Sequence, residues 1–166
     1  KGEDNMFQYR KSALTAAVSI ALLAQAALAA EEQFFPITSY RVGPYGANGQ
    51  SFFGGFTDYL NYVNIKEGGV NGVKLVWEEC ETEYNNAKGI ECYERMKDKA
   101  KVSSGPIHPM STGISYALIE KTAADKIPMA MVGYGRTDAV DGSVFPYAFP
   151  LVTTYQMQAS AIIRFL

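Results

Sequence analysis

The stretch from Asn64 to Leu75 reads NIKEGGVNGVKL and joins the end of a predicted helix to the start of a predicted strand. The Gly68–Gly69 pair ends the helix, because glycine readily takes the left-handed conformation found after a helix C-terminus. The Asn71–Gly72 pair supplies a return turn. Apolar residues at alternate positions from Val73 onward then predict a strand. This order indicates a unit in which helices connect neighbouring strands.

The chain before this turn repeats the same unit. Apolar side chains recur at steps of three and four residues, which predicts an amphipathic helix. A short apolar strand is expected at residues 34–41, and the loop Gly43–Gly49, rich in glycine, should connect the strand to the helix. The helix carries Phe52, Phe56, Tyr59, Leu60 and Val63 on one stripe.

The chain after the turn continues the alternation. Further strands are expected to end at residues 78–81 and to lie at 102–107, 128–132 and 145–149, with helices between them and after the last. The strand at 102–107 is unusually polar, since it contains Ser103, Ser104, Gly105 and Pro106. Five alternations with short connections predict an α/β fold: a doubly wound, parallel, five-stranded sheet with helices on both faces.

Composition limits the possible partners. The 166 residues include 48% hydrophobic ones, and 15 basic against 17 acidic side chains give a net charge of −2. Such a balance offers no basic surface for nucleic acid or for an anionic membrane. The 11 Tyr and 9 Phe exceed what a core of this size needs. The surplus suits either an apolar pocket with polar tips or the ordinary surface of a sheet and its helices.

The N-terminus has the layout of a secretory signal peptide. Arg10 and Lys11 precede an apolar run at 13–24, which leads to Ala27-Leu28-Ala29. The alternative is a short amphipathic helix, but the run is apolar all round. It is too short for the roughly 20 apolar residues of a membrane span, so no stable membrane insertion is expected after cleavage. We therefore expect an extension and signal peptide at 1–29, a mature domain at 30–166 and a periplasmic location.

Export to an oxidising compartment determines the expected state of the two cysteines. In an oxidising compartment, Cys80 and Cys92 are close enough in sequence to form a disulfide. A metal site is the alternative, but the spacing is long for a pair of thiolate ligands, and the single histidine, His108, has no partner. We expect neither a metal nor a cofactor.

Binding residues are expected after the strands, since ligands of such sheets lie beyond the carboxyl ends of the strands. Ser111 and Thr112 open a predicted helix, where unpaired amides and the helix dipole favour a carboxylate; simple N-capping is the alternative. Tyr45 is expected at the mouth of the pocket. The spacing of Gly43–Gly49 matches neither nucleotide-binding glycine motif. His108 is expected to be structural.

Several segments resemble type I periplasmic binding proteins of the branched-chain amino acid (leucine-binding protein) class, close to the relatives that carry aromatic acids. The resemblance runs from about Phe35 to the end and is carried by 64–75, 79–82, 91–95, 109–113 and 133–137. It implies two lobes with a ligand between them, so a second lobe is expected beyond Leu166. It further implies delivery of the ligand to an inner-membrane permease driven by an ATPase.

The resemblance also implies roles for individual residues. The loop at Ser111 would hold the acid group of the ligand, and Tyr134, Gly135 and Thr137 would contact the ligand through backbone groups, a hydroxyl and a ring. Arg136 would pair with a carboxylate, although a solvated loop arginine is an equal alternative.

The function expected from these residues is that of the substrate-binding component of an ABC transporter. Its ligand would be a small carboxylate-bearing solute: an apolar or aromatic amino acid, or an aromatic acid. An extracellular sensor domain of a signalling receptor with the same fold is the alternative. A secreted α/β hydrolase fits less well, because the sequence has no Gly-x-Ser-x-Gly motif and no grouping of nucleophile, base and orienting acid. We therefore predict that the protein is not an enzyme.

Overall fold

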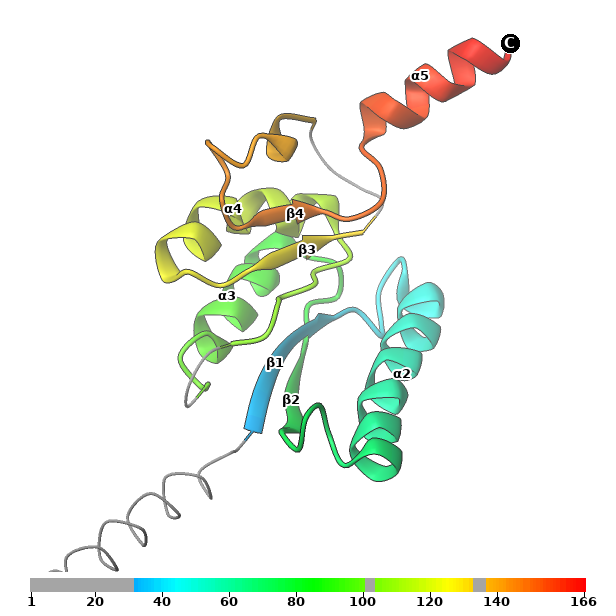
Figure 1. The fold of residues 1–166 in the computed structure, drawn as a ribbon. Helices are drawn as coiled ribbons and strands as arrows, with labels where there is room; N and C mark the ends of the chain where they lie inside the picture. Colours follow the sequence, from blue (N-terminus) through cyan, green and yellow to red (C-terminus); the bar gives the residue numbers. More distant parts are fainter. Residues whose placement is uncertain (1–31, 101–103, 133–136) are drawn as a thin grey trace, which may run out of the picture. The chain divides into compact units, whose positions relative to one another are not determined.

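The computed structural model describes residues 32–100, 104–132 and 137–166. The predicted N-terminal extension and signal peptide lie outside the described residues. The described chain is an α/β unit of parallel strands and helices (Figure 1).

Strands β1 (Glu32–Ser39) and β2 (Lys74–Glu81) pair in parallel, with Glu32 opposite Lys74 and Ser39 opposite Glu81. Strand β1 both begins and ends two residues earlier than predicted. Alternate side chains point to opposite faces of a strand. Ile37 and Leu75 accordingly lie in the buried cluster that contains Phe53, whereas Phe34 and Cys80 lie in another cluster with Cys92.

Helix α2 (Gly46–Tyr62) covers the first of these faces and continues as a π-helical turn, η1 (Val63–Glu67). Gly68 ends it with φ 71°, in the left-handed region, as predicted from the sequence. The expected loop Gly43–Gly49 is shorter than predicted, because α2 already begins at Gly46. Gly49 permits this early start: a Cβ atom there would lie 1.8 Å from the carbonyl oxygen of Tyr40.

Helix α3 (Asn86–Met96) covers the other face of the β1–β2 pair (Figure 1). Its N-cap is Asn85, whose side chain accepts a hydrogen bond of 3.1 Å from the amide of Lys88. Cys80 of β2 and Cys92 of α3 form a disulfide, with their Cα atoms 5.7 Å apart. The disulfide therefore ties a strand to the helix that follows it.

The predicted third strand at 102–107 is not a regular strand. Residues 102 and 103 lie outside the described residues, and the remainder makes only isolated bridges, Ser104 to Phe34 and Ile107 to Met129. The amide of Gly105 donates to β1, and that of Ile107 donates to Pro128. Pro106 between them has no N–H to continue either ladder. The described strands therefore form two parallel pairs joined through this segment, and the five-stranded sheet is not observed.

The second pair consists of β3 (Met129–Met131) and β4 (Ala148–Pro150), with Met129 opposite Ala148. Helix α4 (Thr112–Asp125) precedes β3, and a 3-10 turn, η2 (Thr137–Val140), lies between the strands. The predicted strand at 145–149 is shorter and later than expected. Phe145 instead belongs to a turn, in which its amide donates to Asp141 and its carbonyl accepts from Ala148.

Helix α5 (Tyr155–Phe165) ends the chain and begins at its N-cap Thr154. All of its residues are described and none is buried. Among the described residues, no helix has the length and apolarity that crossing a membrane requires.

Candidate functional site

The loops that follow β1, β2 and the segment 104–107 are connected by ring contacts at the carboxyl ends of these segments. Six ring-bearing side chains connect these three loops and the start of α2. We call them the edge aromatic group: Tyr40, Tyr45, Phe52, Phe53, Tyr84 and His108.

The edge aromatic group has a buried base and an open end. At the base, the ring of Tyr40 lies 5.1 Å from that of Phe53 in an edge-to-face contact, and both residues are buried. At the open end, the rings of Tyr45 and Tyr84 lie 4.4 Å apart, and Tyr45 is 50% exposed. Tyr45 thus lies at an open edge, and its place at the mouth of a pocket stays a prediction.

His108 belongs to the same group. Its ring lies 5.6 Å from that of Phe52. Its buried Nδ1 atom has no hydrogen-bond partner in the part of the chain that the structure describes. Burial lowers the pKa of His108, so the ring is neutral at neutral pH. A buried ring nitrogen of this kind ordinarily has a polar partner.

Ser111 is buried and forms the N-cap of α4, where its Oγ accepts a hydrogen bond of 3.4 Å from the amide of Ile114. Capping, the alternative reading of the sequence, is therefore present. It does not use the whole hydroxyl, since a serine that accepts one hydrogen bond keeps a proton to donate. The first amides of α4 and its dipole also favour an anion at this position.

Thr112 and Thr137 connect this helix end to the rest of the edge. The hydroxyls of Thr112 and Tyr155 lie 2.5 Å apart, which links the start of α4 to the start of α5. The hydroxyl of Thr137 lies 3.1 Å from that of Thr154. The structure therefore brings both predicted threonines close to the segment that follows β4. Tyr134, Gly135 and Arg136 lie outside the described residues.

Arg41 lies next to the first loop and could in principle bind an acid, but its guanidinium already forms an ion pair. It pairs with Glu79 through two nitrogens, with Nη2 2.9 Å from Oε2. The hydrogen bonds that Arg41 donates to the Glu79 carboxylate raise the pKa of Arg41 and lower the pKa of Glu79. Arg41 therefore serves the pairing of β1 with β2 and offers little to a ligand.

Sequence reasoning missed Tyr84 and Phe52 as site residues. The loop after β2 falls under the general expectation that binding residues follow the strands. Nothing in its sequence, however, predicted that Glu83 and Tyr84 would take φ values of 52° and 61°. Phe52 was assigned to the buried stripe of its helix, and its contact with His108 depends on a loop that is distant in sequence.

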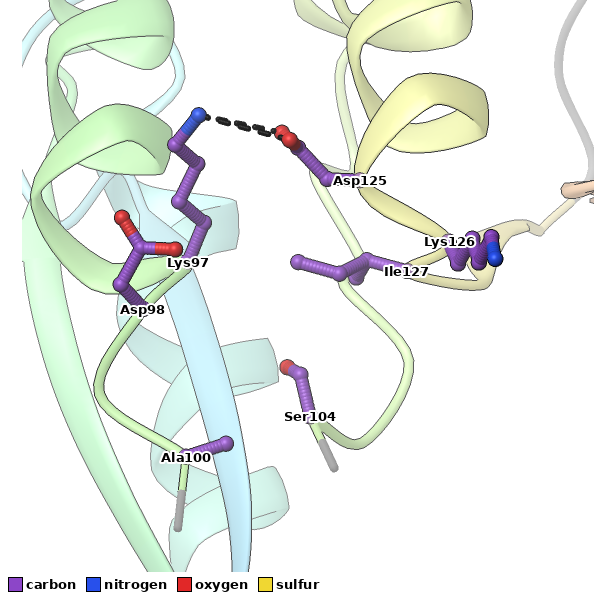
Figure 2. A pocket seen from close by; sticks show the side chains of 7 residues that line it. All are labelled: Lys97, Asp98, Ala100, Ser104, Asp125, Lys126 and Ile127. Atoms are coloured by element: carbon purple, nitrogen blue, oxygen red, sulfur yellow. Dashed lines mark hydrogen bonds and ion pairs between the residues drawn. The ribbon is translucent and has the colours of Figure 1, made fainter. Parts of the chain in front are cut away.

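A cavity of about 420 Å³ lies at the other end of the strands, between the ends of α3 and α4 (Figure 2). Ser104 and Ile127 line it: Ser104 itself bridges to Phe34 of β1, and Ile127 precedes β3, which pairs with β4. Lys97 crosses it to Asp125, with Nζ 3.3 Å from Oδ2, and the hydroxyl of Tyr93 donates to the same carboxylate. This network is internally paired and lies away from the candidate site. Among the described residues, no group of three or more His, Cys, Asp and Glu could hold a metal ion.

Comparison with protein families identifies one match: residues 34–166 fit the model described as periplasmic binding protein. Comparison with curated proteins gives no match. A solved structure described as an ABC transporter permease from the Pseudomonas fluorescens group is 50% identical, with a TM-score of 0.74 over 81% of this chain and 32% of its own.

Two more distant structures share the fold. One is the branched-chain amino acid transporter substrate-binding protein LivJ from Streptococcus pneumoniae with isoleucine: 14% identity, TM-score 0.61, covering 72% of this chain and 33% of its own. The other is an ABC transporter solute-binding protein from R. palustris with 4-hydroxybenzoate: 19% identity, TM-score 0.55, covering 71% of this chain and 31% of its own. The chain spans about a third of the length of these relatives.

Proposed function

Because the chain belongs to the periplasmic binding protein family, we propose that it contributes one lobe of the substrate-binding component of an ABC transporter. The solute is a small molecule with a carboxylate: an apolar or aromatic amino acid, or an aromatic acid. The family is one of binding proteins rather than enzymes. Residues 30–166 form the lobe, residues 1–29 direct export to the periplasm, and an inner-membrane permease receives the solute.

The observation that carries this proposal is the position of the α4 N-terminus beside the edge aromatic group. Met110 packs against the buried cluster that contains Tyr40 and Phe53, and Ser111 follows it directly as the N-cap. A polar end that favours an anion thus lies next to an apolar, aromatic wall. A carboxylate attached to an apolar body has the same two parts.

The solutes of two relatives are consistent with this chemistry, since isoleucine and 4-hydroxybenzoate each carry a carboxylate on an apolar body. In the proposal, the acid group accepts hydrogen bonds from the Ser111 hydroxyl, the Thr112 hydroxyl and the first amides of α4. Tyr45 and Tyr134 border the apolar body, while Gly135, Arg136 and Thr137 complete the polar side. The second lobe supplies the remaining contacts when the two lobes close.

The test is calorimetry on the intact protein with leucine, phenylalanine, 4-hydroxycinnamate and benzoate, each compared with its amide. A hydrogen bond to a charged group contributes about 1.5–3 kcal/mol, so Ser111→Ala should weaken acid binding by roughly ten- to a hundredfold. The wild type should bind each amide more weakly than the corresponding acid by a comparable factor.

Ser111→Gly separates binding from capping. Glycine is an acceptable N-cap, so this variant should keep most of the stability that Ser111→Ala loses, yet it lacks the same hydroxyl. Both variants should therefore bind acids equally weakly. Equal binding of acid and amide by the wild type, or unchanged affinity in both variants, would place the carboxylate elsewhere.

A further inference from the structure

We propose that Tyr84 is a specificity-determining wall of the solute site, and that the chain keeps a strained turn in order to place its ring there. This inference rests on the proposed function, because it concerns the apolar body of the same solute. It adds a residue that the sequence did not indicate, on a loop after β2.

The turn at Thr82–Asn85 has an unusual composition for its geometry. The carbonyl of Thr82 accepts a hydrogen bond of 2.8 Å from the amide of Asn85, and both central residues have positive φ, 52° at Glu83 and 61° at Tyr84. Turns with positive φ at both central positions strongly favour glycine, asparagine and aspartate. Glutamate and tyrosine are disfavoured there because of their Cβ atoms. The local backbone therefore does not explain why these two residues are present.

The surrounding contacts hold this turn from both sides. Thr82 is fully buried; its hydroxyl donates to the carbonyl of Ser39 at 2.8 Å and accepts from the amide of Tyr84 at 3.2 Å. The Glu81 carboxylate accepts from the amides of Glu83 and Arg41, at 2.7 Å each. Strained backbone persists where such contacts fix it, and it gathers at ligand-binding sites.

The two strained residues point to different surroundings. Glu83 forms an exposed ion pair with Lys88. Tyr84 instead joins the edge aromatic group, with its ring 5.0 Å from that of Tyr40 and 4.4 Å from that of Tyr45. The ring is only partly buried, so part of it faces the open end beside the half-exposed Tyr45. Tyr84 thus has a fixed orientation and an accessible surface.

A third strained residue lies on the facing loop. Met110 has φ 50° and packs against the same buried cluster as Tyr84. It directly precedes Ser111, the N-cap that receives the carboxylate in the proposed function. Tyr84 and Met110 therefore stand on the apolar side of the site, and Met110 is the residue next to its polar end along the chain. A solute held by its acid at α4 extends toward the Tyr45–Tyr84 pair.

The experiment combines calorimetry with benzoate and leucine and thermal unfolding of the intact protein. Asparagine suits positive φ, so Tyr84→Asn should unfold at the wild-type temperature or above it. Its affinity for benzoate should nevertheless fall at least about tenfold, because the ring surface is lost. Tyr84→Phe keeps the ring and should bind within about twofold of the wild type. Glu83→Asn is the matched control: it relieves the same strain and should leave binding unchanged.

Each other outcome has a definite meaning. A Tyr84→Asn protein that binds both acids like the wild type refutes this inference and leaves the proposed function intact. A Tyr84→Asn protein that unfolds at a clearly lower temperature also refutes it, because the ring would then be a structural element. A wild type that binds neither acid, nor discriminates acids from amides, refutes both proposals.

Discussion

The side chains of Arg41 and Glu79 form a two-point ion pair that fastens the loop after β1 to strand β2. The Nε and Nη2 atoms of Arg41 each contact one oxygen of the carboxylate. The Arg41 side chain is 33% exposed and that of Glu79 is 27% exposed. This partial burial and bidentate geometry favour the pair over an ordinary surface ion pair.

Loss of this pair should change the acid limb of the stability curve. The pKa of Glu79 is lowered in the folded protein, chiefly by the hydrogen bond from Arg41. The contribution of Glu79 to the free energy of unfolding is therefore complete above its unfolded-state pKa, and it is lost as the pH falls through its folded-state pKa. We expect the free energy of unfolding to decline below about pH 5, and to decline less steeply in Glu79→Gln. Urea unfolding at several pH values across this range measures the free energy of unfolding. The control is Glu120→Gln, because Glu120 is exposed. Parallel curves for wild type and Glu79→Gln would contradict the expectation.

The disulfide should dominate the stability of the β2–α3 connection. Cys80 and Cys92 are 12 residues apart. A closed loop of this size stabilises a protein by about 3 kcal/mol in the chain-entropy model. The Cys80→Ala, Cys92→Ala double variant should therefore unfold at a lower denaturant concentration, and reductant should affect only the wild type. Alkylation of the exported protein without reductant should label neither cysteine; free reaction of both would show that the disulfide does not form.

Two glycines of α2 should respond oppositely to alanine. A Cβ atom at Gly55 meets nothing within 4 Å, so Gly55→Ala should stabilise the protein by about 0.5–1 kcal/mol through helix propensity. At Gly49 the same atom would meet the Tyr40 carbonyl, so Gly49→Ala should destabilise it, by about 1–3 kcal/mol, as overpacking does. Thermal unfolding of both variants decides the matter. A stabilised Gly49→Ala protein would show that α2 does not approach β1 this closely.

Helix α5 should make the 166-residue chain associate when it is expressed alone. Ile163 is 75% exposed and Phe165 is 91% exposed. Exposed apolar surface of this kind drives association. The pair of substitutions Ile163→Glu and Phe165→Glu should shift the chain toward monomer in sedimentation velocity. Ile65→Glu is the control, because Ile65 is equally exposed but lies on η1. Association that persists in the α5 variant, or that Ile65→Glu abolishes, would point to another surface.

The monomeric 166-residue chain should bind no amino acid tightly, since one lobe provides only part of the contacts to the ligand.

Export should depend on the apolar run at 13–24. Leu22→Arg places a charge in this run and should leave the precursor unprocessed. Mass spectrometry of periplasmic protein should find a first residue at Ala30 or Glu31. Mature protein that retains Arg10 would overturn the prediction of cleavage near Ala29, and normal processing of Leu22→Arg would argue against a signal peptide.

The sequence predicted those features that depend on local residue types. Gly68 ends its helix in the left-handed region because glycine does so readily, and Ser111 caps its helix, the alternative that the sequence offered, because its hydroxyl accepts an amide hydrogen bond. The α/β alternation followed from the apolar periodicity. The resemblance to the binding protein family, rather than any single motif, carried the functional prediction.

The features that could not be predicted depend on contacts between distant segments. The segment 104–107 bridges to β1 at one end and to β3 at the other. Its polar composition indicated an unusual strand but did not predict these two partners. The turn at Glu83 and Tyr84 takes a geometry that its own residues disfavour, and Thr82 and Glu81 impose it. The engagement of Arg41 by Glu79 likewise depends on the pairing of β1 with β2.

The irregular segment at 104–107 also affects how the folded chain opens. Among the described residues, few main-chain hydrogen bonds join the β1–β2 pair to the β3–β4 pair, and Pro106 contributes none as a donor. Cooperative units in a protein coincide with regions that share many bonds. Amide protons of β1 and β2 should therefore exchange with deuterated solvent at a common rate, and those of β3 and β4 at another. We expect the backbone between the two pairs to open at a lower free energy than the backbone within either pair.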